Sequence, residues 1–290
     1  MTTLKEYAAR VEARLDQLLP GGGPIVSEAM RYSVMAGGKR LRPSMLLAAA
    51  DMLGGAPEAL DFACAVEMIH TYSLIHDDLP GMDDDTMRRG RPTNHVVFGV
   101  GQAILAGDGL LNFAFETMLA AALRRPERAA AGLSAIAEIA RGSGVTGMIA
   151  GQALDLYCER ERIADVSALE AIQRGKTACM FLYPLRAAAR LQNADEATLA
   201  ALTDYGTAFG LLFQATDDLL DVVGSAEAMG KTLGKDAASG KLTCVSAYGV
   251  DGTRALVEAQ HRAAVEALSG FGERASFFVQ LVDGMVSRTH

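Results

Sequence analysis

The sequence contains no tryptophan, and aromatic residues make up only 6% of its 290 residues. Sustained alternation of apolar and polar residues, the pattern of half-buried β-strands, is nearly missing as well. Half of the residues are apolar, and alanine and leucine, two strong helix formers, dominate the composition. These features favour an all-α fold and provide ample material for a hydrophobic core.

Paired cysteines and an excess of basic residues are also missing. The four cysteines stand far apart in the sequence and none forms a Cys-x-x-Cys pair, so neither a zinc site nor a disulfide framework is expected. Reduced thiols in a cytoplasmic protein are the simplest interpretation. The net charge of −8 argues against nucleic-acid binding, because phosphate backbones require a basic surface. An acidic protein that binds phosphate groups needs metal ions or a local basic pocket.

Long uninterrupted apolar runs are absent too. No stretch of about 18 such residues appears and the N-terminus has no apolar signal core, so we expect no membrane span. No Pro/Ser-rich linker divides the chain, which indicates a single domain over residues 1–290. Apolar or small residues recur every three or four positions from Val96 to Ala121, which predicts a long central helix surrounded by others. Further helices are predicted near residues 3–18, 24–36, 40–54, 57–79, 127–141, 144–160, 167–190, 195–223, 251–268 and 272–287.

Two acid clusters are the strongest chemical feature. The first reads Asp-Asp-Leu-Pro-Gly-Met-Asp from Asp77 to Asp83, and the second reads Asp-Asp-Leu-Leu-Asp from Asp217 to Asp221. Residues four apart share one helix face, where like charges repel unless cations neutralise them. Mg²⁺ is suited to this role, since it takes one or two carboxylates and completes its shell with water and phosphate oxygens. An acidic run can also be a solvated helix end, but both clusters follow largely apolar segments, which indicates a polar rim over an apolar cavity.

Basic residues lie close to the acid clusters. The segment Gly37–Pro43 combines two glycines with three cations, and Arg88 and Arg89 follow the first acid cluster. Arginine binds phosphate bidentately and lysine acts as a point charge, whereas a single such residue is more often a solvated surface group. His70 lies two helical turns before Asp77 and could donate to a phosphate. Further polar or basic candidates are Gln152, Asp155, Lys176, Gln214, Lys231, Lys235 and Lys241.

This ordered set resembles the trans-isoprenyl (polyprenyl) diphosphate synthase family over nearly the whole chain. The four-residue spacer between Asp78 and Asp83 is similar to the bacterial farnesyl and plant-type geranylgeranyl branches. Ala178 departs from the glycine that the family often has after Lys-Thr. The resembling segments are Gly37–Pro43, His70–Arg91, Gly151–Asp155, Lys176-Thr177, Phe213–Asp221 and Gly230-Lys231.

The resemblance implies an isoprenoid synthase fold with helices around a central apolar cavity, usually as a homodimer. It implies three Mg²⁺ ions held by Asp77, Asp83 and Asp217, with Asp78 and Asp221 supporting. The residues implied to hold the allylic diphosphate are Arg88, Lys176 and Lys231. Those implied to hold isopentenyl diphosphate are Lys39, Arg42, His70 and Arg89. Thr177 and Gln214 are implied to face the developing allylic cation.

The implied reaction is the Mg²⁺-dependent, head-to-tail condensation of dimethylallyl or geranyl diphosphate with isopentenyl diphosphate. An aromatic residue at the position of Tyr72 goes with the C15 product in this family, so farnesyl diphosphate is expected and geranylgeranyl diphosphate is the alternative. Tyr72 could also be ordinary packed core. A class I terpene cyclase is a weaker alternative, because its second metal motif mixes Asn, Ser/Thr and Glu. A non-catalytic synthase subunit tends to lose one acid motif, and this chain has both.

Overall fold

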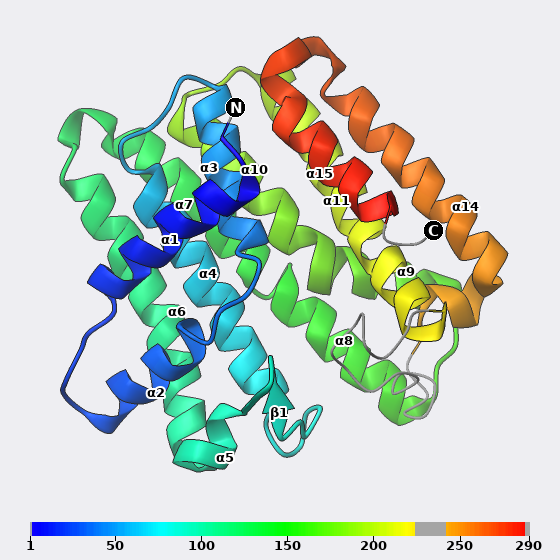
Figure 1. Ribbon diagram of the computed structural model, residues 1–290, viewed down its shortest axis with the longest axis horizontal. Coiled ribbons are helices and arrows are strands. Elements are labelled where there is room, and N and C mark those ends of the chain that lie inside the picture. Colours follow the sequence, from blue (N-terminus) through cyan, green and yellow to red (C-terminus); the bar gives the residue numbers. More distant parts are fainter. Residues whose placement is uncertain (1, 224–241, 288–290) are drawn as a thin grey trace. The chain divides into compact units, whose positions relative to one another are not determined.

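The computed structural model describes residues 2–223 and 242–287, and these residues are almost entirely helical (Figure 1). Their only strands form one short antiparallel hairpin. The all-α prediction is therefore confirmed. The chain divides into two compact units, Met1–Ala137 with Ala187–Asn193 and Glu138–Arg186 with Ala194–His290.

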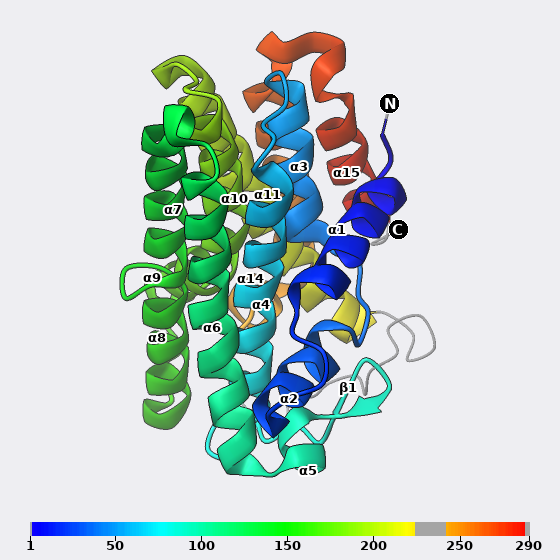
Figure 2. The same ribbon diagram turned by 90° about the vertical axis from the view of Figure 1, so that its left-hand side faces the viewer.

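Helix α4 is buried over most of its length within the first unit. Its residues are apolar on nearly all sides, as expected for a helix covered by neighbours. Figure 2 shows α4 between α6 and α1, and α4 also contacts α2 and α3. The elements of this unit are α1 (Leu4–Leu18), α2 (Ile25–Val34), α3 (Leu41–Met52), α4 (Ala59–Asp77), β1 (Met87–Arg88), β2 (Arg91–Pro92), α5 (Asn94–Phe98), α6 (Val100–Leu123) and a 3₁₀ turn at Pro126–Arg128.

The predicted helix from Val96 is interrupted, and it is not the central one. Gly99 adopts φ +84° and ψ 157°, a conformation open to glycine, and so separates α5 from α6. One face of α6 packs along α4, whereas Val100, Ile104 and Leu105 remain 41–53% exposed. The periodicity was real, but periodicity alone does not say whether neighbours cover every apolar face.

Helix α6 also bears on the expectation of no membrane span. Within residues 2–223 and 242–287 it is the one helix that is long and apolar enough, by length and composition, to cross a membrane. Buried residues make up 39% of its most apolar window. Core helices can have the same length and composition, and α6 packs along α4 as such a helix does. The absence of a span stays a prediction.

The second unit is organised around α11, which packs along α14. Tyr205 and Phe209 of α11 stack at 5.9 Å, and the Tyr205 hydroxyl donates to the carbonyl oxygen of Phe278 across 3.0 Å. These buried rings form the aromatic core of the unit. Its elements are α8 (Met148–Glu161), α9 (Val166–Ile172), a π-helical turn at Gln173–Ala178, α11 (Glu196–Val223), α14 (Cys244–Ala267), a 3₁₀ segment at Ser269–Ala275 and α15 (Ser276–Val286), while α7 (Ala129–Ser143) and α10 (Cys179–Leu191) contribute residues to both units.

Candidate active site

The first acid motif closes on itself at the end of α4. The four-residue spacer begins with a turn in which the Met82 N–H donates to the Leu79 carbonyl oxygen across 2.9 Å. The chain then returns, and the Asp83 N–H donates to the carbonyl oxygen of Asp77 across 2.8 Å. Asp84 follows in the left-handed region at φ +50°, which Asp tolerates better than most residues. The first and last aspartates of the motif are thereby neighbours despite their separation in sequence.

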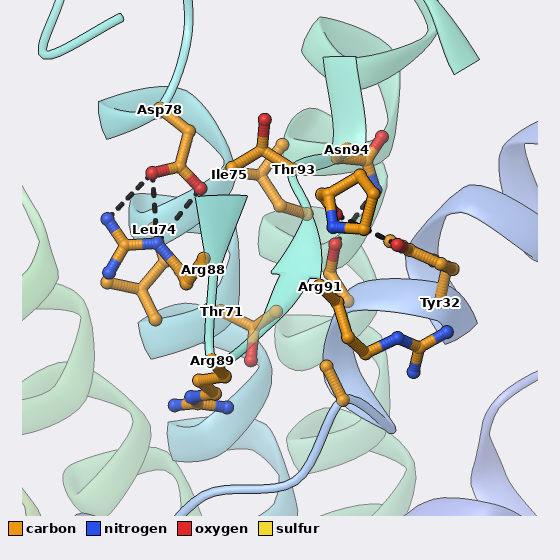
Figure 3. A pocket seen from close by; sticks show the side chains of 13 residues that line it. Tyr32, Thr71, Leu74, Ile75, Asp78, Arg88, Arg89, Arg91, Thr93 and Asn94 are labelled. Atoms are coloured by element: carbon orange, nitrogen blue, oxygen red, sulfur yellow. Dashed lines mark hydrogen bonds and ion pairs between the residues drawn. The ribbon is translucent and has the colours of Figure 1, made fainter. Parts of the chain in front are cut away.

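Asp78 has a different environment from Asp77 and Asp83. It is only 3% exposed, and both of its oxygens accept from Arg88, over distances of 2.7 to 2.9 Å (Figure 3). Burial raises the pKa of Asp78 above its ordinary value, although Arg88 opposes this shift. Burial tends to lower the pKa of Arg88, but the hydrogen bonds and charge of Asp78, together with the charges of Asp77 and Asp85, make the net shift upward. Asp78 therefore holds Arg88 in place beside the first acid motif.

The β1–β2 hairpin delivers the two arginines that follow this motif. Its two-residue turn consists of Arg89 and Gly90, both with positive φ (+53° and +73°), as the tight turns that suit twisted strands require. Arg88 lies before the turn and contacts Asp78, while Arg91, its register partner, lies 4.4 Å from the centre of the Tyr32 ring. Figure 3 shows Arg88 and Arg89 reaching different surroundings. The hairpin thus separates two adjacent arginines into two sites.

Arg89 packs against the glycines of the segment Gly37–Pro43. It donates to the Gly37 carbonyl oxygen, and a Cβ on Gly38 would lie 2.7 Å from the Arg89 guanidinium carbon. Gly38 also has φ +128°, a backbone conformation that favours glycine, whereas the guanidinium could shift to make room for a Cβ. On the same segment Arg42 Nη1 lies 3.3 Å from His70 Nε2, while Lys39 is exposed. Of the residues in this segment, Arg42 therefore lies beside His70, and the two glycines lie against Arg89.

The pKa of His70 reflects the positive charge of the arginines around it. Its pKa lies well below the ordinary value chiefly because the partly buried ring is desolvated, and also because four arginines add repulsion. The imidazole is therefore neutral near pH 7. A site that disfavours one more positive charge stabilises an anion, as a diphosphate-binding pocket must. The four arginines are Arg42, Arg89, Arg88 and Arg40.

Arg40 has a role that the sequence did not reveal. It adopts φ +49° and is 2% exposed, with Nη1 2.7 Å from the buried Glu67 carboxylate and Nη2 donating to the Val34 carbonyl oxygen across 2.6 Å. Glu67 lies one helical turn before His70 on α4. Of the three cations in the segment, one therefore faces inward and attaches it to α4. Only burial distinguishes it from Lys39 and Arg42.

In the second unit, Lys176 and Thr177 lie on the π-helical turn, a deviation from the α-helix that often occurs at functional sites. A Cβ on Gly151 of α8 would lie 2.1 Å from the Lys176 nitrogen, so only glycine allows this approach. Asp155, one turn further along α8, lies 2.7 Å from Lys176 Nζ. Ala178, the departure from the family pattern, is buried at the end of the turn. The turn lines a pocket of about 170 Å³ within this unit.

The second acid motif is divided by burial in the same way as the first. Asp217 and Asp221 are partly exposed and lie four residues apart on one face of α11. Asp218 is 5% exposed, and its oxygens accept from Gln214 Nε2 across 2.8 Å and from the Cys244 N–H across 2.7 Å. The sequence pattern marked Asp217 and Asp221, and it contained no sign of the role of Asp218.

Tyr72 lies on α4, five residues before Asp77. Its side chain is 6% exposed, and its ring meets the His76 ring edge-on at 5.7 Å. His76 Nε2 lies 3.1 Å from the carbonyl oxygen of Ile104, where Gly107 leaves room for the imidazole. Tyr72 is thus a packed aromatic residue in contact with His76, which itself is held against α6.

The sequence-predicted residues fall into two groups. The first unit brings together Lys39, Arg42, His70, Asp77, Asp78, Asp83, Arg88 and Arg89. In the second unit, Lys176, Thr177 and Gln214 line one pocket together with Asp218, and Asp217 and Asp221 lie on α11. Lys231, Lys235 and Lys241 lie outside the residues that the structure describes.

The carboxylates suit Mg²⁺ better than a metal held by protein alone. Among residues 2–223 and 242–287, no three His, Cys, Asp or Glu side chains form a ready metal cage. In the second unit, the partly exposed Asp217 and Asp221 of α11 form one pair of carboxylates. In the first unit, Asp77 and Asp83, joined by a backbone hydrogen bond, form another, and both pairs supply hard oxygen ligands. Mg²⁺ takes one or two carboxylates and obtains its other ligands from water and phosphate. The residues present therefore fit Mg²⁺ with a phosphorylated ligand.

Comparison with known proteins agrees with this chemistry. The sequence pattern of the family described as "Polyprenyl synthetase" matches residues 23–272. Geranylgeranyl pyrophosphate synthase 9 of Arabidopsis thaliana is 45% identical over 270 residues, covering 91% of this chain and 74% of that protein. A dimethylallyltranstransferase of Fischerella ambigua is 39% identical over 289 residues, covering 99% and 83%. The crystal structure of an FPP/GFPP synthase from Zymomonas mobilis has a TM-score of 0.86 at 32% identity, covering 98% and 97%.

Proposed function

Because the chain belongs to the polyprenyl synthetase family and is a trans-prenyl transferase, we propose that it condenses dimethylallyl and geranyl diphosphate with isopentenyl diphosphate to give farnesyl diphosphate. The observation that carries this proposal lies at the C-terminal end of α4. There the Asp83 N–H bonds to the Asp77 carbonyl, and Asp78 holds Arg88. Carboxylates suited to Mg²⁺ and a cation suited to diphosphate thus occur together.

We propose that Asp77, Asp83 and Asp217 hold Mg²⁺, with Asp78 and Asp221 supporting them. Bound Mg²⁺ would neutralise the negative charge that grows on the diphosphate as its C–O bond breaks. Asp78 supports the site indirectly, because it fixes Arg88 beside Asp77 and Asp83. Asp221 shares the partly exposed face of α11 with Asp217.

The cations divide between two diphosphates. Arg88 and Lys176, each already oriented by a carboxylate, would hold the allylic diphosphate, together with Lys231. Lys39, Arg42, His70 and Arg89 would hold isopentenyl diphosphate. Neutral His70 fits this role, because its pKa is lowered by burial and by the surrounding arginines. A diphosphate there relieves the repulsion among those arginines.

Cleavage of the allylic C–O bond releases diphosphate and leaves a delocalised carbocation. The double bond of isopentenyl diphosphate then attacks the cation, a C–C bond forms, and a proton is lost to a base such as the departing diphosphate. The Thr177 hydroxyl oxygen and the Gln214 amide oxygen would stabilise the cation, because both present partial negative charge. Water must be excluded from this step, since it would quench the cation.

The C15 product follows from Tyr72. An aromatic ring about 7 Å before Asp77 along α4, at ~1.5 Å per residue, can stop a growing chain that extends away from the diphosphate. Its contact with His76 supports this role, because a braced ring yields less readily. Geranylgeranyl diphosphate remains the second candidate, since the Arabidopsis relative carries that name.

We also propose a homodimer. Several apolar side chains along α5 and α6 are 41–53% exposed, and such a stripe suits burial against a second copy. Sedimentation of the purified protein tests this, and a monomer at micromolar concentration would contradict it. The stripe consists of Val96, Val97, Val100, Ile104 and Leu105.

The decisive experiment incubates the pure protein with Mg²⁺, isopentenyl diphosphate and each of the C5, C10 and C15 allylic starters, and then sizes the products. We expect C15 diphosphate from the C5 and C10 starters. Accumulation of C20 diphosphate would favour the second candidate. A hydrocarbon product from an allylic diphosphate alone would indicate a terpene cyclase, and absence of turnover would indicate a non-catalytic subunit.

A further inference from the structure

A chain of hydrogen bonds in the second unit connects the π-helical turn to the start of α14. The Thr177 hydroxyl lies 2.9 Å from Gln214 Oε1, and Gln214 Nε2 lies 2.8 Å from one oxygen of Asp218. The other Asp218 oxygen accepts from the Cys244 N–H across 2.7 Å. Three segments far apart in the sequence therefore share one polar connection.

The donors and acceptors along this connection are fixed by what each group can donate or accept. An ionised carboxylate only accepts, so Asp218 requires the NH₂ group of Gln214 to face it. The amide oxygen must then face the opposite way, toward Thr177, and the Thr177 hydroxyl must donate to it. The hydroxyl uses its single proton in this contact and keeps its lone pairs as acceptors. Both side chains thereby direct oxygen lone pairs away from Asp218.

The environment of Asp218 reinforces this orientation. The carboxylate is 5% exposed, and Cys244 and Gln173 beside it are also buried. The Cys244 N–H is at the first position of α14, where helix N–H groups have no intrahelical acceptor and favour negative charge. A buried carboxylate anchored in this way leaves the Gln214 amide one satisfactory orientation.

We propose that Asp218 is a positioning residue of the prenyl transfer reaction, which sets the dipole direction of Gln214 and Thr177 so that their oxygens face the developing allylic cation. This role rests on the proposed function of Thr177 and Gln214. It differs from that of the neighbouring Asp217 and Asp221, since Asp218 acts through hydrogen bonds to the protein. Asp218 would thus help to stabilise the allylic cation, while Asp217 and Asp221 would help to bind the diphosphate through Mg²⁺.

The test is a double-mutant cycle. The side chain introduced by Asp218→Asn has one oxygen and one NH₂ group, so it cannot accept from both Gln214 and Cys244. If the oxygen of the introduced amide keeps its hydrogen bond from the Cys244 N–H, the NH₂ group of that amide faces Gln214. Two NH₂ groups cannot bond to each other, so the Gln214 amide rotates to present its oxygen. Adding Gln214→Glu restores an acceptor toward both the new amide at position 218 and the Thr177 hydroxyl, at unchanged total charge. Asp204→Asn, an exposed change of the same charge on the same helix, is the control.

We expect Asp218→Asn to lower kcat by about 100-fold, similar to the loss of one oriented dipole at a reacting centre. The KM values and the Mg²⁺ requirement should change little, and Asp204→Asn should match the wild type. The double variant should recover at least about tenfold over Asp218→Asn, and should exceed Gln214→Glu alone, because the two changes compensate. A double variant no more active than either single one would overturn the proposal. The proposal would also be overturned if Asp218→Asn raised the Mg²⁺ requirement and adding Gln214→Glu did not lower it again. That result would indicate that Asp218 is itself a metal ligand.

Thermal unfolding gives a readout that does not depend on the reaction. The double variant should melt above both single variants, because it alone satisfies every partner in the connection. If the wild type shows no prenyl transfer, the proposed function fails, while the melting temperatures still test the hydrogen-bond direction. If the wild type is active and the melting temperatures of the cycle are simply additive, the function stands and this inference fails.

Discussion

The Asp83 N–H donates to the carbonyl oxygen of Asp77 across 2.8 Å, so the two outer aspartates of the first motif adjoin each other at the end of α4. A shared metal site requires this proximity. On the helix that continues from Asp77 they would be six residues apart, about 9 Å along the axis at ~1.5 Å per residue. The turn over Leu79–Met82 removes that separation. The two aspartates are therefore brought together by a loop and not by helix geometry.

The acid motifs should be essential for turnover. Asp77→Asn and Asp217→Asn each remove a carboxylate that we propose as a Mg²⁺ ligand, and we expect each to lower kcat by about 100-fold or more. Steady-state assays across Mg²⁺ concentrations measure this, and circular dichroism checks that the fold is intact. Asp204→Asn is the matched control. Near-normal activity of either variant would contradict a two-motif site.

Substitutions in the two groups of cations should weaken the binding of different substrates. Arg88→Ala should raise the KM for the allylic diphosphate by about tenfold or more, since a charged hydrogen bond contributes about 1.5–3 kcal/mol. Lys39→Ala should raise the KM for isopentenyl diphosphate instead. Each KM is measured with the other substrate saturating. Equal effects of both variants on both substrates would show that the division is wrong.

The product should lengthen when the ring of Tyr72 is removed. Tyr72→Ala opens space five residues before Asp77, so the main product should shift from C15 to C20 or longer at similar total isoprene incorporation. Tyr72→Phe keeps the ring and should keep the C15 product. Chromatography of the dephosphorylated alcohols measures chain length. An unchanged product from Tyr72→Ala would show that another residue sets the length.

The buried pair of Arg40 and Glu67 should matter for stability. Arg40→Ala leaves a buried carboxylate without its partner, which typically costs about 3–5 kcal/mol of the free energy of unfolding. Arg10→Ala breaks an exposed pair with Asp51 and should cost less than about 1 kcal/mol. Urea denaturation compares the two variants. A small effect of Arg40→Ala would mean that the segment Gly37–Pro43 is attached to α4 by other contacts.

His70 should make stability depend on pH in the acidic range. Burial and four arginines lower its pKa in the folded state, whereas in the unfolded chain it titrates near 6.5. Below pH 6.5 the unfolded state binds the proton more readily, so the free energy of unfolding falls as pH decreases. His70→Gln cannot titrate and should lose less stability between pH 7 and pH 5. Denaturation curves at the two pH values measure the difference, and parallel losses in both proteins would contradict it.

The features that the sequence alone determined depend on residues close together along the chain. Helical periodicity and the scarcity of strand patterns predicted the all-α fold. The spacing of Asp217 and Asp221 predicted a shared helix face, and both lie partly exposed on α11. These inferences succeed because helix geometry depends on residues three or four positions apart.

Tertiary structure decided which of several similar residues face inward. Asp78 and Asp218 resemble their neighbours in the sequence, but in the fold both are buried, and they accept hydrogen bonds from Arg88 and from the Cys244 N–H at the start of α14. Arg40 differs from Arg42 in its burial and in its contacts with the Val34 carbonyl oxygen and with Glu67, 27 residues away. A charge is stable inside a protein only where a partner and hydrogen bonds are present. Such partners come from distant segments, so the fold, and not the local pattern, decides which charges remain at the site.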